Sequence, residues 1–149
     1  MSKRAAAAMA VVAGVLLSPA PAGAASDVCV AANGAVRTQH GTSACQASGT
    51  GSVAIAMNGS FASATGGDHN LAKAFGDHSV AQAGEGNNNT AIASGDNSLA
   101  DALHGNNNTA IASGDNSFAA AGAGNNDTAT ATSPGCTALA LGSGVSNSC

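Results

Sequence analysis

The sequence predicts an all-β protein: a two-sided parallel β-solenoid, or β-roll, with about five coils of 19 residues around an alanine core. Two observations predict this fold class. The string NNNTAIASGDNS occurs at 87–98 and again, unchanged, at 106–117, nineteen positions later. Within each repeat, residues alternate with a period of two over about five positions, bounded by glycine, asparagine and aspartate, as in short strands between turns.

The start of the chain has the pattern of a secretion signal. Lys3 and Arg4 precede an apolar stretch at 5–17, and small residues follow at 22–24. The apolar stretch is too short to span a membrane. We therefore expect residues 1–24 to be removed as a signal peptide. This predicts a secreted protein, extracellular or associated with the cell wall, that has no membrane contact once the signal is removed.

Composition narrows the partners that the remaining chain could bind. Without the signal it holds two basic and eight acidic residues, a net charge of 2 − 8 = −6. This balance argues against nucleic acid as a partner.

With no Trp, no Tyr and three Phe, the chain cannot build an ordinary core of large side chains. Composition alone would indicate disorder, but the repeat favours a solenoid, which folds by stacking its coils.

Paired units define the coil. Units of the form G-[DN]-[HN]-[SN]-x-A-x-A-x follow one another at alternating spacings of nine and ten residues, so each coil contains two strands. The units start at Gly67, Gly76, Gly86, Gly95, Gly105, Gly114 and Gly124, the last with Asp127 in the fourth position. Weaker copies extend the array to 49–142, with an N-terminal cap expected at 25–48 and a C-terminal cap segment at 143–149.

The alternation also assigns the inside of the roll. Alanine occupies every position of one parity in these strands, from Ala54 to Ala140. The opposite parity includes Lys73, Gln82 and Asp101, and a charge inside so thin a roll would lack partners. We therefore expect the alanines to point inward and the larger side chains outward. The two sheets should then lie closer than the usual separation of roughly 10 Å.

Stacked coils should align the turn residues as well. One expected column contains Asn88, Asn107 and Asn126, which would form an amide ladder along the axis. A second contains Asp77, Asp96 and Asp115, whose acids would repel one another mildly.

The four cysteines lie at the ends of the array, Cys29 and Cys45 before it and Cys136 and Cys149 at its end. Solenoid ends expose unpaired strand edges and need caps. An open rod keeps its two ends apart, so we predict the disulfides Cys29–Cys45 and Cys136–Cys149. Zinc is disfavoured, because the spacings are long and no CxxC is present.

The Ser-x-Ala-x-Ala units, such as Ser52-Val53-Ala54-Ile55-Ala56, resemble the head repeats of YadA-type trimeric autotransporter adhesins. The resemblance covers about 49–142 and implies a left-handed parallel β-roll that associates sideways into trimers. The coil is longer than in that family, and we find no heptad stalk or outer-membrane barrel segment, so anchored adhesion is not implied. In composition the chain is also similar to secreted actinobacterial proteins.

No residue stands out as catalytic machinery. Every candidate Ser or Thr nucleophile lies within a repeat without a base at an unrepeated position, so we expect no enzyme activity and no cofactor. The histidines His40, His69, His78 and His104 are scattered, which predicts solvated turn residues and no metal site. Calcium in the turns is a further alternative, disfavoured because the acid follows the first glycine and three of the seven units have Asn in place of Asp.

The outward positions hold the candidate binding residues. Phe61, Val80, Leu99 and Phe118 recur every nineteen residues and would form an apolar column on one face. Such columns are typical of association surfaces. This one predicts a structural or adhesive protein that self-assembles as a dimer or trimer, or that holds a cell-surface ligand. The alternative is that the terminal segments fold over the column.

The threonine and isoleucine residues of the opposite face indicate an alternative function. Leu71, Thr90, Thr109 and Thr128 lie there beside Lys73, Ile92, Ile111 and Thr130. Outward Thr and Ile on a flat roll resemble the ladders of solenoid antifreeze proteins, so ice or surface binding is the alternative function. Against it, only 128–132 gives a full Thr-x-Thr-x-Thr rank, and Lys73 interrupts the face.

Overall fold

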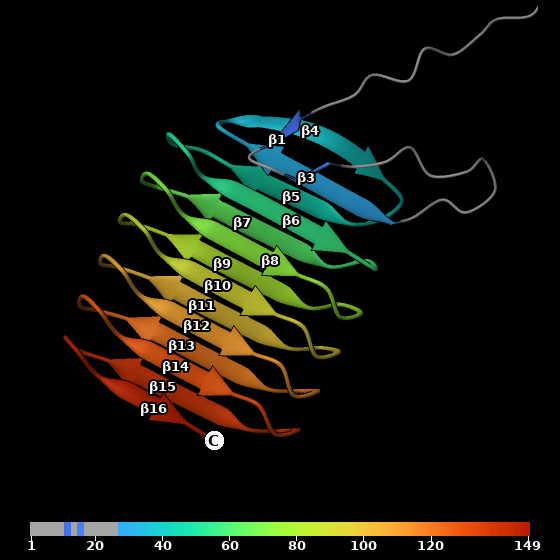
Figure 1. Ribbon diagram of the computed structural model, residues 1–149. Coiled ribbons are helices and arrows are strands. Elements are labelled where there is room, and N and C mark those ends of the chain that lie inside the picture. Colours follow the sequence, from blue (N-terminus) through green and yellow to red (C-terminus); the bar gives the residue numbers. More distant parts are fainter. Residues whose placement is uncertain (1–10, 13–14, 17–26) are drawn as a thin grey trace, which may run out of the picture.

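The computed structural model describes residues 11–12, 15–16 and 27–149. The predicted signal peptide, 1–24, lies outside these residues apart from two short strands. The described part of the chain is all β, with coils stacked along one axis and two opposed sheets (Figure 1), which confirms the predicted fold class. This part contains no helix, and so none that is long and apolar enough to cross a membrane.

The strands of the array coincide with the predicted Ala-x-Ala pairs, and turn residues separate them. In chain order the strands are β1 (Val11–Val12), β2 (Val15–Leu16), β3 (Val28–Ala32), β4 (Ala35–His40), β5 (Ala44–Ala47), β6 (Val53–Met57), β7 (Phe61–Thr65), β8 (Leu71–Ala74), β9 (Val80–Gly84), β10 (Thr90–Ala93), β11 (Leu99–Leu103), β12 (Thr109–Ala112), β13 (Phe118–Gly122), β14 (Thr128–Ala131), β15 (Thr137–Leu141) and β16 (Ser146–Ser148).

Two sheets form the roll. The six-stranded sheet has the order β15-β13-β11-β9-β7-β5, and the eight-stranded sheet has the order β16-β14-β12-β10-β8-β6-β3-β4. Central strands pair in parallel, as Thr90 opposite Thr109 and Leu99 opposite Phe118 show. Five complete coils run from β6 to β15, and β5 and β16 add a half coil each. The roll therefore has about six turns, one more than expected.

The interior is alanine, as predicted. Every alanine of the inward parity from Ala54 to Ala140 is at most 2% exposed. Facing strands such as β10 and β11 have Cα atoms within 8 Å of each other. The Cα atoms of Cys29 and Cys45, which face each other across the roll, lie 5.6 Å apart. The roll is therefore thinner than a usual pair of sheets at about 10 Å. Since each methyl group buries little apolar area, hydrogen bonds between coils must supply much of the cohesion.

The turns use residues that accept a left-handed backbone. Among the residues that the structure describes, twelve non-glycine residues have positive φ, and seven of these are asparagine, which tolerates this region better than most residues. Glycine is required where coils approach most closely. A Cβ at Gly86 would lie 1.7 Å from the carbonyl oxygen of Gly105, and one at Gly105 would lie 1.6 Å from that of Gly124. This close approach explains why these units begin with glycine.

The expected amide ladder through Asn88, Asn107 and Asn126 is wrong. These residues do align in successive coils, because the Asn107 N–H donates to the Asn87 carbonyl and the Asn126 N–H to the Asn106 carbonyl. They are, however, exposed left-handed turn residues with φ of 58°, 59° and 63°. Their backbone conformation turns the side chains toward solvent, so the amides that join the coils come from neighbouring positions.

The buried ladder runs through Asn70, Asn89, Asn108 and Asp127. In each of the three steps, the backbone N–H of one member donates to Oδ1 of the member before it, at 3.0 Å. Each asparagine Nδ2 also donates to a glycine carbonyl in the next coil, at 2.8 to 3.1 Å. A second, exposed ladder joins Asn87, Asn106 and Asn125.

Asp127, the last member of the buried ladder, lacks the amide donor. Its Oδ1 accepts the Val145 N–H at 2.9 Å, but its Oδ2 is buried with no hydrogen-bond partner in the described part of the chain. Asp127→Asn should restore the donor that the earlier coils have. We expect the free energy of unfolding to rise by about 1 to 3 kcal/mol, measured by guanidinium denaturation at constant pH.

The reverse substitution is the matched control. Asn108→Asp removes the hydrogen bond from Nδ2 to the Gly124 carbonyl, which is 3.1 Å long, and leaves a buried oxygen without a donor. It should lower the free energy of unfolding by about 1 to 3 kcal/mol. If Asp127→Asn destabilised the protein while Asn108→Asp were neutral, the stability of the buried ladder would not depend on amide donors.

The aspartate column is held by backbone amides. The Asp77 N–H donates to Oδ1 of Asp96 at 2.9 Å, and the Asp96 N–H donates to Oδ1 of Asp115 at 3.1 Å. The expected alignment of these three residues is confirmed. Each hydrogen bond to a carboxylate partly offsets the repulsion between the stacked acids.

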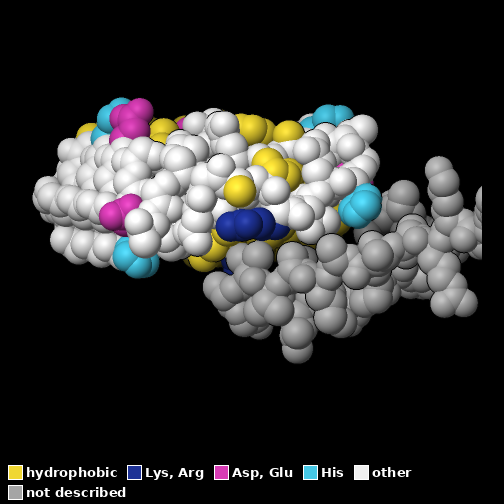
Figure 2. All heavy atoms as spheres, turned by 90° about the horizontal axis from the view of Figure 1, so that it is seen from above, with side chains coloured by type: hydrophobic (Ala, Val, Ile, Leu, Met, Phe, Trp, Pro, Cys, Tyr) yellow, Lys and Arg dark blue, Asp and Glu magenta, His cyan; other side chains and the backbone are white. Residues whose placement is uncertain are grey.

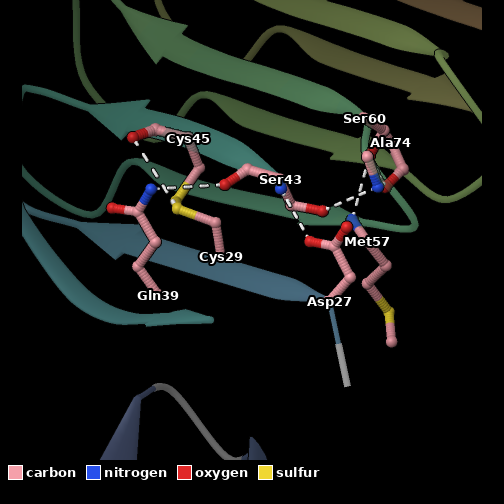
Figure 3. Close-up of a disulfide and its surroundings, with 9 residues drawn as sticks. Asp27, Cys29, Gln39, Ser43, Cys45, Met57, Ser60 and Ala74 are labelled. Carbon is pink, nitrogen blue, oxygen red and sulfur yellow. Dashed lines mark hydrogen bonds between the residues drawn. A yellow bond between two sulfur atoms is a disulfide. The ribbon is translucent and has the colours of Figure 1, made fainter. Parts of the chain in front are cut away.

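An antiparallel hairpin closes the N-terminal end. β3 pairs antiparallel with β6 on one side and with β4 on the other, and the register shifts between Val30 and Ala31. Cys29 of β3 forms the predicted disulfide with Cys45 of β5 (Figure 3). This bond joins the two sheets through the interior.

Asp27 fixes the turn that precedes β5 to the start of β3 (Figure 3). Its Oδ1 accepts the Ser43 N–H at 2.6 Å, and its Oδ2 accepts the Thr42 hydroxyl at 2.7 Å. Hydrogen bonds from Ser43, and secondly from Thr42, hold the pKa of the Asp27 carboxyl well below its ordinary value. The stabilisation by this carboxylate is therefore complete above the ordinary carboxyl pKa of about 4 and is lost as the pH falls below it.

At the C-terminal end, β16 covers the last coil. Asn147 stands opposite Ala129, and its Nδ2 donates to the Leu139 carbonyl of β15 at 3.1 Å. Cys149 continues this line, since its N–H donates to the Thr130 carbonyl, and it forms the predicted disulfide with Cys136 just before β15. Each end of the roll therefore has a disulfide between its two sheets.

Candidate functional site on the outer faces

The four candidate residues form a continuous column on the six-stranded sheet. Phe61 stands opposite Val80, Val80 opposite Leu99, and Leu99 opposite Phe118. All four are half-buried, whereas the alanines that follow them are buried inside. The structure thus brings every predicted binding residue to one outer face. We call these four residues the apolar column.

Sequence reasoning missed part of this surface. Leu139 and Leu141 of β15 are 43% and 57% exposed. They stand opposite Ala120 and Gly122, and Gly122 in turn stands opposite Leu103. The outward parity of these leucines was visible, but alanine and glycine break their nineteen-residue recurrence. We define the six-stranded face as the outward side chains of β7, β9, β11, β13 and β15.

One acid interrupts the six-stranded face. Asp101 of β11 lies between Gln82 and Ala120 of the neighbouring strands. Its Oδ1 is buried without a hydrogen-bond partner among the described residues. Burial raises the pKa of the Asp101 carboxyl above its ordinary value. Ionising this group therefore opposes folding, and its cost grows as the pH rises above the ordinary carboxyl pKa of about 4.

The outward side chains of the eight-stranded sheet become more polar toward the C-terminal end. We define the eight-stranded face as the outward side chains of β6, β8, β10, β12 and β14. Near the N-terminal end it is apolar, with Val53 opposite Leu71. Toward the C-terminal end it carries hydroxyl groups, with Thr109 opposite Thr128 and Ile111 opposite Thr130. The predicted Thr and Ile positions therefore do share one face.

Lys73 of β8 is the counterpart of Asp101 on this second face. It lies between Ile55 of β6 and Ile92 of β10. Across residues 27–149, the close contact between a basic and an acidic side chain joins His104 Nε2 to Glu85 Oε2 at 2.7 Å, and Lys73 has no acid within 4.0 Å. In the view from above the roll, hydrophobic side chains lie mainly in the middle, and histidines and acids lie mainly toward the two ends of the view (Figure 2). Each face therefore has one charged residue, and the two charges have opposite signs.

The histidines do not form a cluster. His69 and His78 lie in the turns before and after β8, which places them at opposite edges of the roll. His104 pairs with Glu85 in the adjacent coil, and both side chains are exposed. In the described part of the chain, no group of three or more His, Cys, Asp or Glu residues is placed to hold a metal ion.

The C-terminal segment does not fold over the apolar column. Residues 146–148 form β16, which pairs with β14 in the eight-stranded sheet. The N-terminal hairpin extends that same sheet at its other end. Among residues 27–149, the column therefore stays open to an outside partner.

No protein-family model matches this sequence, and neither a curated protein nor a solved structure is significantly similar to it.

Proposed function

We propose that this protein is a secreted, non-catalytic binding module that associates through its six-stranded face. The apolar column supports the proposal most directly. Its four side chains are regular, outward and half-buried, and an alanine core does not require them. Contiguous apolar surface of this kind marks association sites. Secretion is supported by the signal pattern at 1–24 and by two disulfides, which persist in oxidising compartments.

The roles of the repeat serines support a structural function. Ser60 Oγ donates to the Ala74 carbonyl at 2.8 Å, and Ser98 Oγ donates to the Gly95 carbonyl at 2.6 Å. Both serines are at most 2% exposed. Ser60 thus joins a turn to the end of β8 and Ser98 closes its own turn, and their burial keeps both hydroxyl groups away from a substrate.

Leu99→Ser tests the column directly. We expect it to leave the strands intact, because this side chain points away from the core, and to weaken apolar binding by about 1 to 2 kcal/mol. Adsorption of the oxidised protein to a methyl-terminated monolayer should then fall about 5- to 30-fold in affinity. Surface plasmon resonance at concentrations where the protein is monomeric would measure this without any contribution from self-association.

Val36→Ser is the matched control. Val36 is 52% exposed and lies on β4, the edge strand of the eight-stranded sheet, outside the strands that define the two faces. Its loss should leave adsorption unchanged. Equal losses for Val36→Ser and Leu99→Ser would mean that adsorption is unspecific, and the column would then have no special role.

Ice or surface binding through the eight-stranded face is the second candidate function. The observation that favours it is the in-register column of Thr90, Thr109 and Thr128. Lys73 and the apolar residues of β6 restrict this threonine surface to three strands. A thermal-hysteresis measurement separates the two candidates, because apolar association predicts no hysteresis.

A further inference from the structure

We propose that the six-stranded face binds the eight-stranded face of a second copy of this chain, with Asp101 of one copy paired to Lys73 of the next. The inference rests on the proposed function, because it names the occupant of the same face. Copies joined in this way would stack front to back.

Complementary charge is the first argument. The Oδ1 atom of Asp101 is already buried without a partner, and covering the face would desolvate the carboxylate completely. Lys73 lies between two isoleucines with no acid in reach. An unpaired charge buried in an interface is strongly unfavourable, whereas a cation and an anion brought together satisfy each other.

The same charges exclude contacts between like faces. Two six-stranded faces packed together would bury two copies of Asp101 and no cation. Two eight-stranded faces would bury two copies of Lys73 and leave Asp101 without a cation. Only contact between unlike faces pairs the charges, which provides specificity as well as attraction.

The geometry allows the pair to form. Sheets pack face to face about 10 Å apart, a distance that a lysine side chain of about 6 Å and an aspartate can bridge. Lys73 and Asp101 are 28 residues apart, or about one and a half coils of about 4.8 Å. Neighbouring copies would therefore be offset by about 7 Å along the axis.

The available area favours a chain of copies over an isolated pair. Four of the five strands of the eight-stranded face have four residues, so the contact is about 13 Å wide. With the offset of about 7 Å, about 17 of the roughly 24 Å that five strands span along the axis overlap, and one contact covers about 220 Å². A standard interface buries about 800 Å² per partner. One contact would therefore be weak, and a copy that uses both faces doubles its covered area to about 440 Å². Contacts between unlike faces do not close on themselves, so association should continue with rising concentration.

Charge reversal tests the pairing. Lys73→Asp and Asp101→Lys should each lower the self-association constant of the oxidised protein at least tenfold in sedimentation velocity. An equimolar mixture of the two variants should restore association to within a few-fold of wild type. In the mixture, each face of one variant meets the opposite charge on the other, so the copies alternate.

Matched variants control for net charge. Asp77→Lys changes the charge as Asp101→Lys does, but it lies in a turn; Arg37→Asp matches Lys73→Asp and lies in β4. Both should associate like wild type. Recovery of association in the mixture also shows that the two face variants are folded.

Three outcomes would overturn the inference. In the first, the single variants associate like wild type, or their mixture stays monomeric. In the second, Asp101→Lys associates with wild type while Lys73→Asp has no effect, which indicates contact between two six-stranded faces. In the third, wild type stays monomeric at all concentrations while Leu99→Ser still reduces adsorption to the monolayer. That result would leave the proposed function standing and remove the second copy as its partner.

Discussion

Ala100→Leu is expected to prevent the central coils from closing and to lower the free energy of unfolding by about 3 kcal/mol. Ala100 is fully buried, and the Cα atoms of β11 lie within 8 Å of those of the facing strands β10 and β12. Three additional carbon atoms have no space in such an interior unless the sheets separate. Separation would break the short turns that join them. Circular dichroism during thermal unfolding measures the effect.

Asp101→Leu is the control for this substitution. It adds a leucine to the same strand at the adjacent, outward position, where no opposing sheet limits its size. We expect a melting temperature at or above that of wild type, since the partly buried carboxylate is removed. If Ala100→Leu had the same melting temperature as Asp101→Leu, the roll would be able to widen and the core would not be limited to alanine.

Removal of the N-terminal disulfide should have an effect of similar size. Cys29→Ala/Cys45→Ala places alanine at two inward positions, so the side chains match the rest of the core and the lost covalent link dominates. The two residues are 16 apart in sequence. A link that closes a loop of this length contributes about 3 kcal/mol. Guanidinium denaturation of the double variant should show a loss of that order.

The C-terminal pair gives a contrasting case. Cys136→Ala/Cys149→Ala releases β16, a strand of three residues, whereas the N-terminal pair holds the longer strands β3 and β5. Hydrogen exchange should therefore show local fraying near 146–148, with the central coils still protected. The opposite result would be global unfolding on loss of Cys136–Cys149 but not on loss of Cys29–Cys45. It would mean that the C-terminal disulfide contributes more to stability than the N-terminal one.

The core and the caps could be predicted because simple rules govern them. Strict alternation with alanine fixes which side chains point inward, and an open rod leaves one sensible pairing of four cysteines. The inward position of Asn70, Asn89 and Asn108 follows from the same parity as the alanines. It was missed because asparagine before a strand indicates a turn, and nothing in the sequence showed that glycine carbonyls would satisfy its amide.

Other features depend on contacts that leave no repeating signal. The antiparallel pairing of β3 with β6 and β4 falls outside the repeat, so no periodicity indicated its direction. The burial of Asp101 depends on Gln82 and Ala120, which come from two other coils. Left-handed coiling and assembly into trimers, both implied by the resemblance to adhesin head repeats, stay predictions.

The sameness of successive coils makes the length of the rod adjustable. Residues 87–98 and 106–117 are identical, and each step of the buried ladder spans 19 residues. A gene duplication or deletion of nineteen codons would insert or remove one layer without changing either disulfide-closed end. Each added layer would lengthen the molecule by about 4.8 Å and enlarge both outer faces in proportion. The number of nineteen-codon repeats in the gene would then set the area of the proposed binding faces, and no new kind of contact between coils would be needed.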